Sequence, residues 1–252
     1  MSLSGRTALV TGAGRGIGRA IAVQLADAGV RSAVVARTEA ELDETVRLVN
    51  RRGGTAVAIS ADLSAHGSAA EVVDRAVDAL GPVDILVNNA AVVQPLGSTA
   101  ELDIATWSAA FDVNVFAAVA LALAVVPKMV EGGWGRVANV SSGVVARPGF
   151  MVGGNAYAAT KAALEAHTLN LAEEVRDTGV TVNVYRPGTV DTGMQAWIRE
   201  HGEGRLSVAT YTRFVDYHAN SSLISPEHSA GSLLTRLADS ATGQVWDVND
   251  QL

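Results

Sequence analysis

The sequence predicts an α/β domain with a parallel, doubly wound sheet, and three observations support this. Strand-like and helix-like runs alternate along all 252 residues, and no linker rich in proline, glycine or serine interrupts them. The strand-like runs are nearly continuous in apolar residues, as in strands covered on both faces. Hydrophobic residues make up 48% of the chain, enough for an ordinary buried core. We therefore expect a single domain over residues 1–252.

Seven runs rich in valine, isoleucine or threonine are predicted strands. In chain order they are RTALVTG (6–12), RSAVVAR (31–37), TAVAIS (55–60), VDILVN (83–88), RVANVS (136–141), VTVNVY (180–185) and QVWDV (244–248). Between them, stretches such as 40–53 and 69–81 are apolar at every third or fourth position, which predicts amphipathic helices. Several of these stretches end in glycine, a common residue just after a helix.

The least regular part of the chain is 188–225. Within it, MQAWIREHG (194–202) and VATYTRFVDYHANS (208–221) predict short amphipathic helices. So long an excursion from a compact sheet is typical of a lid or binding segment, although plain surface packing is the alternative. As part of a lid, Trp197 would contact the substrate; in the alternatives it belongs to the core or to a subunit contact.

Composition excludes several classes of site. The chain has no cysteine, so disulfides, thiolate catalysis and thiolate metal sites are excluded, and its five histidines lack metal-binding spacing. The net charge of −7 argues against a nucleic-acid partner. The N-terminus lacks an apolar signal core, and the apolar run from Ala117 is too short to span a bilayer. We expect a cytoplasmic protein with neither metal nor membrane partner.

The stretch TGAGRGIG lies between the first predicted strand and a predicted helix. Gly12, Gly16 and Gly18 would permit a tight turn, close approach of a pyrophosphate, and close packing of the helix on the strand. The free N–H groups at the start of the helix, where Ile17 lies, would bind the phosphates. Glycines also mark ordinary turns, which is the alternative interpretation of this stretch.

The spacing of these glycines is similar to the TGxxxGIG pattern of the short-chain dehydrogenase/reductase family. Further elements follow in the family's order: NNAA (88–91), Asn114 in DVNVF, NVSS (139–142), YAATK (157–161) and RPGTVDT (186–192). The resemblance covers roughly residues 5–195. It implies a Rossmann-like seven-stranded sheet, a nicotinamide cofactor, and a catalytic group of Asn114, Ser142, Tyr157 and Lys161.

Tyr157 and Lys161 are four residues apart and so share one face of a helix. Ketone reduction needs a proton for the oxygen, and a nearby ammonium can lower the pKa of a tyrosine by roughly 1–3 units. The hydroxyl of Ser142 would steady the developing oxyanion, with Ser141 as its rival. The interval from Ser142 to Tyr157 is longer than is common in the family. The alternative interpretation of Tyr157 and Lys161 is a YxxxK pair that lies on a helix surface by chance.

The resemblance also assigns cofactor contacts. It implies that Asn88 and Ala90 flank the cofactor, that Asp62 lies beside the adenine, and that Asn114 holds a water of a proton relay. The alternatives are a structural role for Asn114, and helix capping by Asp62 or Ser64. The remaining residues expected at the cofactor are Leu63, Pro187, Gly188, Val190 and Thr192, together with Tyr157 and Lys161.

Charge at the end of the second strand favours NADP(H) over NAD(H). An acidic residue there would accept a hydrogen bond from the adenosine 2′-hydroxyl. This chain has Ala36 at that place, Arg37 next to it, and Arg15 within the glycine turn. Two guanidinium groups without a carboxylate suit a 2′-phosphate. The alternative is that both arginines are solvated turn residues.

The sequence therefore predicts an NADPH-dependent oxidoreductase that interconverts a ketone or aldehyde and an alcohol. The first alternative is a 3-oxoacyl-acyl-carrier-protein reductase, although positive charge is sparse at 131–136 and 176–180. The second is a non-catalytic NADP-binding sensor or scaffold, against which the intact Tyr157–Lys161 pair argues. The resemblance further implies a homodimer or homotetramer with a small-molecule substrate.

Overall fold

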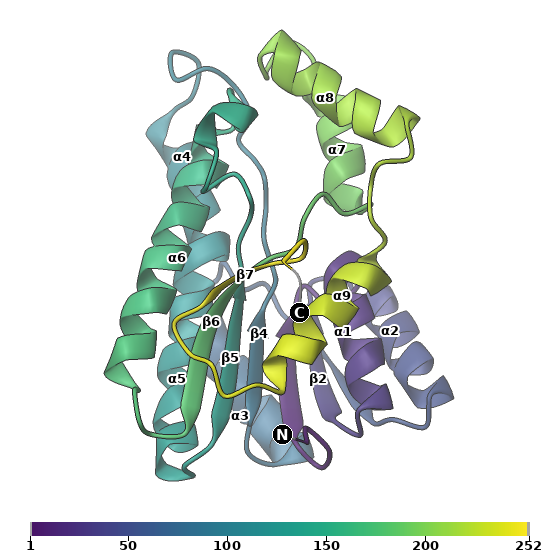
Figure 1. Ribbon diagram of the computed structural model, residues 1–252, viewed down its shortest axis with the longest axis vertical. Coiled ribbons are helices and arrows are strands. Elements are labelled where there is room, and N and C mark those ends of the chain that lie inside the picture. The colour runs from purple at the N-terminus through teal and green to yellow at the C-terminus, as the bar shows by residue number, and fades with distance from the viewer. Residues whose placement is uncertain (1, 251–252) are drawn as a thin grey trace.

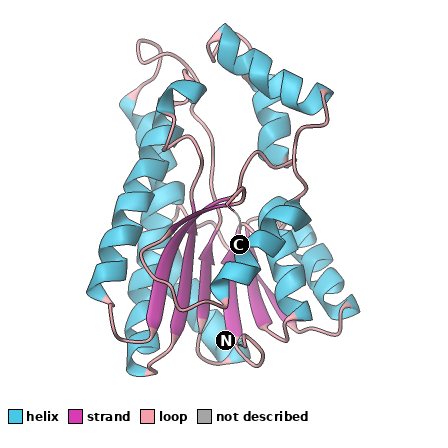
Figure 2. Cartoon of the chain, in the orientation of Figure 1, coloured by secondary structure: helices cyan, strands magenta, loops and turns pink. Residues whose placement is uncertain are grey.

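The computed structural model describes residues 2–250 of the chain. One seven-stranded sheet runs through the molecule, in the order β3-β2-β1-β4-β5-β6-β7, and every neighbouring pair is parallel (Figure 2). All seven predicted strands are confirmed. They are β1 (Thr7–Thr11), β2 (Arg31–Ala36), β3 (Ala56–Ser60), β4 (Ile85–Asn88), β5 (Gly135–Val140), β6 (Val180–Arg186) and β7 (Val245–Asp247).

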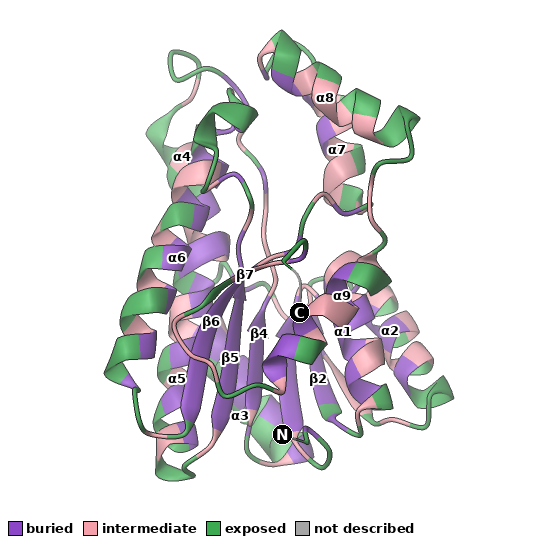
Figure 3. Ribbon diagram, in the orientation of Figure 1, coloured by how far each residue is buried: buried purple, intermediate pink, exposed green. Residues whose placement is uncertain are grey.

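Helices cover both faces of this sheet (Figure 1). One face packs against α1 (Gly16–Asp27), α2 (Glu39–Arg51) and α9 (Pro226–Leu237). The other packs against α3 (Ser68–Leu80), α5 (Ala117–Glu131) and α6 (Asn155–Glu174). The five central strands are buried almost throughout, which explains their continuous apolar sequences, whereas the edge strands β3 and β7 are only partly buried (Figure 3).

The strand order places a binding crevice at one edge of the sheet. From β1 the chain winds outward through β2 to β3, and then returns to β4 on the other side of β1. Ligands of doubly wound sheets bind at such a switch point, beyond the carboxyl ends of the strands. The glycine turn follows β1, and the NNAA motif follows β4, so both motifs meet there.

The segment 188–225 forms two helices, α7 (Gly193–His201) and α8 (Val208–Ala219), as predicted. They stand beyond the carboxyl ends of the strands (Figure 1). Ile198 and Leu206 of this segment belong to a separate apolar cluster that also includes Tyr157. In it they pack with Met151, the last residue of the short 3₁₀ helix η2 (Pro148–Met151). The segment is thereby attached to the loop that precedes α6.

A long helical run precedes β5. It joins α4 (Ile104–Phe111), the π-helical turn η1 (Asp112–Phe116) and α5. By length and composition alone the run Ile104–Glu131 could cross a bilayer, and it is longer than the apolar stretch that the sequence singled out. Half of its most apolar window is buried inside the protein, and α5 packs on α3 and the sheet. These contacts are those of a core helix.

Candidate active site

A cleft of about 590 Å³ opens at the carboxyl edge of the sheet, between the glycine turn and α7. Most of the predicted site residues line it. They are Gly12, Arg15, Gly16, Ile17, Arg37, Asp62, Leu63, Ala90, Ser142, Tyr157, Lys161, Pro187, Gly188, Val190, Thr192 and Trp197. The structure thus brings together motifs that are spread over most of the chain. The predicted site residues outside this lining are Gly18, Asn88 and Asn114.

Two glycines of the turn, Gly12 and Gly18, have no room for a larger residue. Gly12 has a φ of +62°, and a Cβ on it would lie 2.8 Å from Nδ2 of Asn89. A Cβ on Gly18 would lie 2.4 Å from the carbonyl oxygen of Gly12, so Gly18 packs beneath the turn. Arg15, at the N-cap of α1, makes no side-chain capping bond. The N–H groups of the first turn, at Gly16 and the residue after it, are therefore available to an anion.

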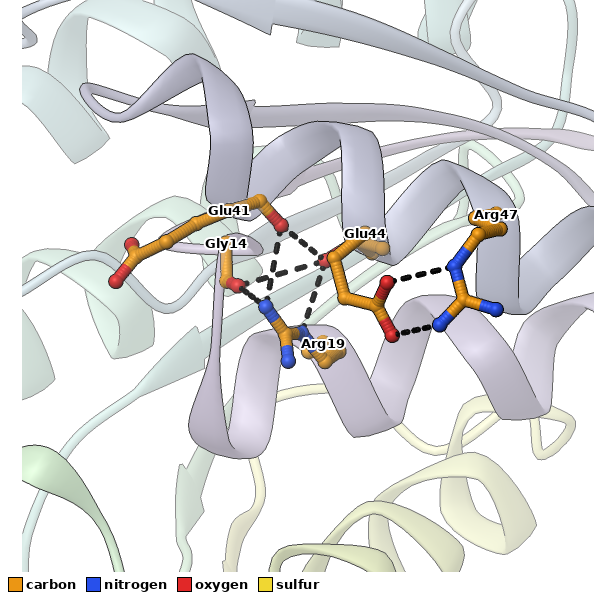
Figure 4. A network of polar contacts seen from close by, with 6 residues as sticks. Gly14, Arg19, Glu41, Glu44 and Arg47 are labelled. Atoms are coloured by element: carbon orange, nitrogen blue, oxygen red, sulfur yellow. Dashed lines mark hydrogen bonds and ion pairs between the residues drawn. The ribbon is translucent and has the colours of Figure 1, made fainter.

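The same turn is clamped to α2 (Figure 4). The Arg19 guanidinium donates hydrogen bonds to the carbonyl oxygens of Gly14 and Glu41, the latter at 3.1 Å. Its Nε donates to Oγ1 of Thr45 at 3.1 Å, and that hydroxyl donates to the carbonyl of Ala13 at 2.9 Å. The turn therefore has a fixed shape before any ligand arrives. The sequence argument did not identify this role of Arg19.

The end of the cleft that Arg15 and Arg37 line, where the sequence predicts the adenosine of the cofactor, also contains a carboxylate. Glu41, one turn into α2, lines the cleft beside Arg15 and Arg37. Its Oε1 lies 3.4 Å from Nη1 of Arg15, in a partly exposed ion pair. The region therefore holds two guanidinium groups and one carboxylate. Glu41 was missed because only the residues that directly follow β2 were considered.

Asp62 lines the cleft and is held in a local turn. Its Oδ1 accepts hydrogen bonds from the backbone N–H and the hydroxyl of Ser64, at 3.0 and 2.8 Å. These bonds lower the pKa of Asp62. Because α3 begins only at Ser68, neither Asp62 nor Ser64 caps that helix.

Asn88 faces away from the cleft. As the last residue of β4 it points to the face covered by α5, where its Nδ2 donates to Oδ1 of Asn139 at 2.8 Å and to the carbonyl of Ala118 at 3.4 Å. Strand alternation places it there, whereas Ala90, beyond the strand, lines the cleft. The Asn88 side chain therefore joins β4 to β5 and α5, and the expectation that this residue flanks the cofactor stays a prediction.

Asn114 lies in the π-helical turn and is saturated with protein contacts. Its Oδ1 accepts from the N–H of Val92 at 2.8 Å, and its Nδ2 donates to the Val92 carbonyl at 2.8 Å. The same Nδ2 donates to Oγ1 of Thr160 at 3.0 Å, so the amide ties the chain after β4 to α6. These contacts agree with the alternative in which Asn114 has a structural role. A water relay through Asn114 stays a prediction.

Tyr157 and Lys161 both lie buried at the floor of the cleft, one turn apart on α6. The Lys161 Nζ is 5.9 Å from the centroid of the Tyr157 ring and donates to the carbonyl of Val140 at 2.7 Å. Ser142 lies beside Tyr157, close enough to lower the pKa of its phenol. The Ser141 hydroxyl instead donates to Glu165 at 2.7 Å. The two serines are thereby distinguished, and Ser142 is the one beside the phenol.

The protonation of this pair differs from the sequence expectation. Burial raises the pKa of Tyr157, and the neighbouring Ser142 only partly offsets this. The predicted net lowering of this pKa therefore has the wrong sign for this structure, because the buried phenolate would lose its surrounding water. Burial also lowers the pKa of Lys161 to about 8, with Glu165 acting in the opposite direction. At neutral pH the phenol keeps its proton and the amine stays charged.

The far end of the cleft is apolar and aromatic. Met194 and Trp197 of α7 and Phe214 of α8 line it, with Met151 from the loop before α6. The Trp197 ring stacks on His201, with centroids 4.5 Å apart. No sequence pattern indicated that Met151 would line the cleft. It lies in the stretch between Ser142 and Tyr157, which is longer than is common in the family. This end suits a bulky uncharged group.

Comparisons with known proteins agree with this geometry. The family described as short chain dehydrogenase matches residues 6–203. A short chain dehydrogenase of Pseudocercospora fijiensis is 39% identical over 196 residues, which is 77% of this chain and 62% of that protein. A 3-oxoacyl-acyl-carrier-protein reductase of Synechocystis sp. is 29% identical over 98% of this chain and 97% of its own.

Solved structures show the same fold. An actinorhodin polyketide ketoreductase with NADPH superimposes with a TM-score of 0.87 at 32% identity, covering 98% of this chain and 97% of its own. Among the similar structures two hold NADPH, one holds NADP at low occupancy and one holds NAD+.

The geometry generates a test of Tyr157. If the phenol supplies the proton, as the sequence predicts, Tyr157→Phe should lower turnover of a carbonyl substrate by roughly 100- to 10,000-fold. NADPH affinity, measured by fluorescence titration, should stay near the parent value. Lys161→Ala should impair both. Tyr217→Phe, which changes a tyrosine outside the cleft lining, is the matched control. Parent-like turnover of Tyr157→Phe would remove the residue from the reaction.

Proposed function

The chain belongs to the short-chain dehydrogenase/reductase family and acts on alcohol or carbonyl groups, and we propose that it is an NADPH-dependent reductase of bulky, uncharged ketones and aldehydes. The observation that carries the proposal is the single cleft that joins the glycine turn, the buried Tyr157–Lys161 pair and the apolar end at Trp197.

The cleft residues fit a nicotinamide dinucleotide. The glycine cradle would be filled by a Cβ at Gly12, and the uncapped N–H groups at the start of α1 suit a pyrophosphate. Arg37, Arg15 and Lys161 line the cleft. In the proposal the two arginines bind the phosphate of NADP and Lys161 binds a ribose hydroxyl. When bound, the reduced dinucleotide supplies a hydride to the carbonyl carbon of the substrate.

The protein's own residues supply the proton. As the carbon gains the hydride, the carbonyl oxygen gains negative charge and takes the proton from Oη of Tyr157. Ser142 steadies that oxygen by donating a hydrogen bond. The Tyr157 phenolate that forms is stabilised by the Lys161 ammonium nearby, and it regains a proton from solvent.

A carrier-bound 3-oxoacyl substrate is the second candidate, and one observation favours it. Phe150 and Arg213 are chain neighbours of the cleft-lining residues Met151 and Phe214. The guanidinium carbons of Arg147 and Arg213 lie 5.4 and 4.4 Å from the centroid of the exposed Phe150 ring. Guanidinium groups at this place suit the phosphate of a carrier arm. The sensor or scaffold alternative is disfavoured because the buried Tyr157–Lys161 pair is intact.

We also propose a homo-oligomer. Ile104, Phe116 and Leu123 are 78%, 58% and 71% exposed along α4, η1 and α5, and a second copy of the chain would cover them. A cytoplasmic location stays a prediction from the cysteine-free composition.

The cofactor preference is tested at the adenosine end. Ala36→Asp combined with Arg37→Ala should weaken NADPH binding by about tenfold or more, since a lost charge-assisted hydrogen bond costs about 1.5–3 kcal/mol. Glu41→Gln is the matched variant, and its expected effect on NADPH affinity is opposite, because it frees Arg15 from its ion pair. It should raise the ratio of NADPH to NADH affinity. If the double variant retains the parent ratio, Arg37 does not bind the phosphate.

The substrate class is tested at α7. Trp197→Ala should raise KM for a bulky ketone by about tenfold, or about 1.4 kcal/mol, while the Kd of NADPH stays unchanged. Val208→Ala, on the exposed side of the same segment, should leave both constants unchanged. An unchanged KM for several bulky ketones in a folded Trp197→Ala variant would exclude Trp197 from the pocket. If only acyl-carrier substrates turn over, the carrier candidate replaces the proposal.

A further inference from the structure

A buried ion pair lies one turn beyond Lys161 on α6. Glu165 is 6% exposed, and its carboxylate accepts two hydrogen bonds from the Arg186 guanidinium, Nε to Oε1 at 2.9 Å and Nη2 to Oε2 at 2.7 Å. Oε1 also accepts the bond from the Ser141 hydroxyl. A bidentate pair with a third donor is a strongly directional contact.

This pair joins the three elements that carry the acid and its partners. Glu165 belongs to α6, Ser141 follows β5, and Arg186 ends β6. The register pairs Val140 with Tyr185, so the ends of β5 and β6 lie side by side. The carbonyl of Val140 is the one that holds Lys161. The pair therefore fixes α6 against the strand ends at the height of the ammonium.

We propose that Glu165 and Arg186 are positioning residues of the reaction, which hold Lys161 under the end of β5 and set how readily its amine keeps its proton. The inference rests on the proposed roles of Tyr157 and Lys161. Neither Glu165 nor Arg186 lines the cleft, so both act through Lys161 and the serine turn.

The charges of the cluster support this role. Glu165 is negative, whereas Arg186 and Lys161 are positive, so the cluster carries one net positive charge, which balances the phenolate formed at Tyr157. Glu165 opposes the effect of burial on the pKa of Lys161. Removing its charge should therefore lower that pKa, and removing the charge of Arg186 should raise it.

The groups that face this cluster come from several elements. Those around Lys161 are Tyr157 and Glu165 on α6, Val140 and Ser141 at the end of β5, Arg186 on β6, and Asn114, which reaches the same layer from η1 through Thr160. Asp247 and Asp250, at and after β7, face Arg186 and raise its pKa less than the bonds with Glu165 do.

The chain offers a direct measurement, because its only lysines are Lys128 and Lys161. Protein labelled with [¹³Cε]lysine should give two titrating NMR signals, and Lys128→Arg assigns them. In the parent, the Lys161 signal should titrate near pH 8, and the exposed Lys128 serves as the internal reference. This titration needs no substrate, so it tests the inference even if the proposed substrate class is wrong.

Glu165→Gln should move the Lys161 titration down by about one unit, and Arg186→Gln should move it up. The double variant Glu165→Gln/Arg186→Gln should titrate near the parent, and it keeps the test available if a single variant fails to fold. Glu173→Gln, at an exposed position of the same helix, should change nothing. The alkaline limb of the reduction rate should shift in parallel with each titration.

A Lys161 signal that stays in place in both single variants, or that moves in the same direction in both, would overturn the inference. So would a shifted titration without any shift of the alkaline limb in an enzyme that turns over. If the titrations shift as expected but no variant, nor the parent, reduces any ketone, the proposed function fails and the control of the Lys161 charge stands.

Discussion

The structure around the site depends on the burial of one ammonium group. Lys161 is only 2% exposed, and a charge taken out of water is costly unless its surroundings replace the lost hydration. The carbonyl of Val140 accepts one of its protons, and the Glu165–Arg186 pair fixes the helix that carries it. An amine with a pKa of about 8, beside a phenol whose pKa burial has raised, is the chemical result.

That constraint shapes the whole face of α6 that meets the sheet. The buried polar residues on it recur at helical spacing: Tyr157, Thr160, Lys161, Glu165 and Thr168. Each has a partner from another element or from its own helix. Thr168 accepts from Asn139, which accepts in turn from Asn88, so one chain of hydrogen bonds joins α6, β5 and β4. A polar layer of this kind, between two apolar cores, holds the acid in one place.

Local patterns in the sequence were sufficient to predict the sheet, the glycine turn and the helices. The apolar strands, the glycine turn and the helices α7 and α8 are set by residues close together in the chain, and all were predicted. Glu41, Arg186 and the inward orientation of Asn88 depend on which elements become neighbours, and no local pattern reports that. The pKa of Tyr157 was predicted with the wrong sign because a one-turn spacing shows the ammonium but not the loss of water. The buried polar face of α6 could not be predicted either. Helix faces are recognised by apolar residues that recur at helical spacing, and here the buried residues are largely polar.

The central claim is that this cleft transfers a hydride to a carbonyl carbon while Tyr157 supplies the proton. The most direct measurement is a single turnover with NADPH deuterated at the transferring position of C4 and a bulky aryl ketone, followed by mass and NMR analysis of the product. We expect an alcohol with deuterium on its carbinol carbon in the parent, and a greatly slowed single turnover in Tyr157→Phe. Tight binding of the deuterated cofactor, with no deuterium in any alcohol across a broad ketone and aldehyde panel, would contradict it.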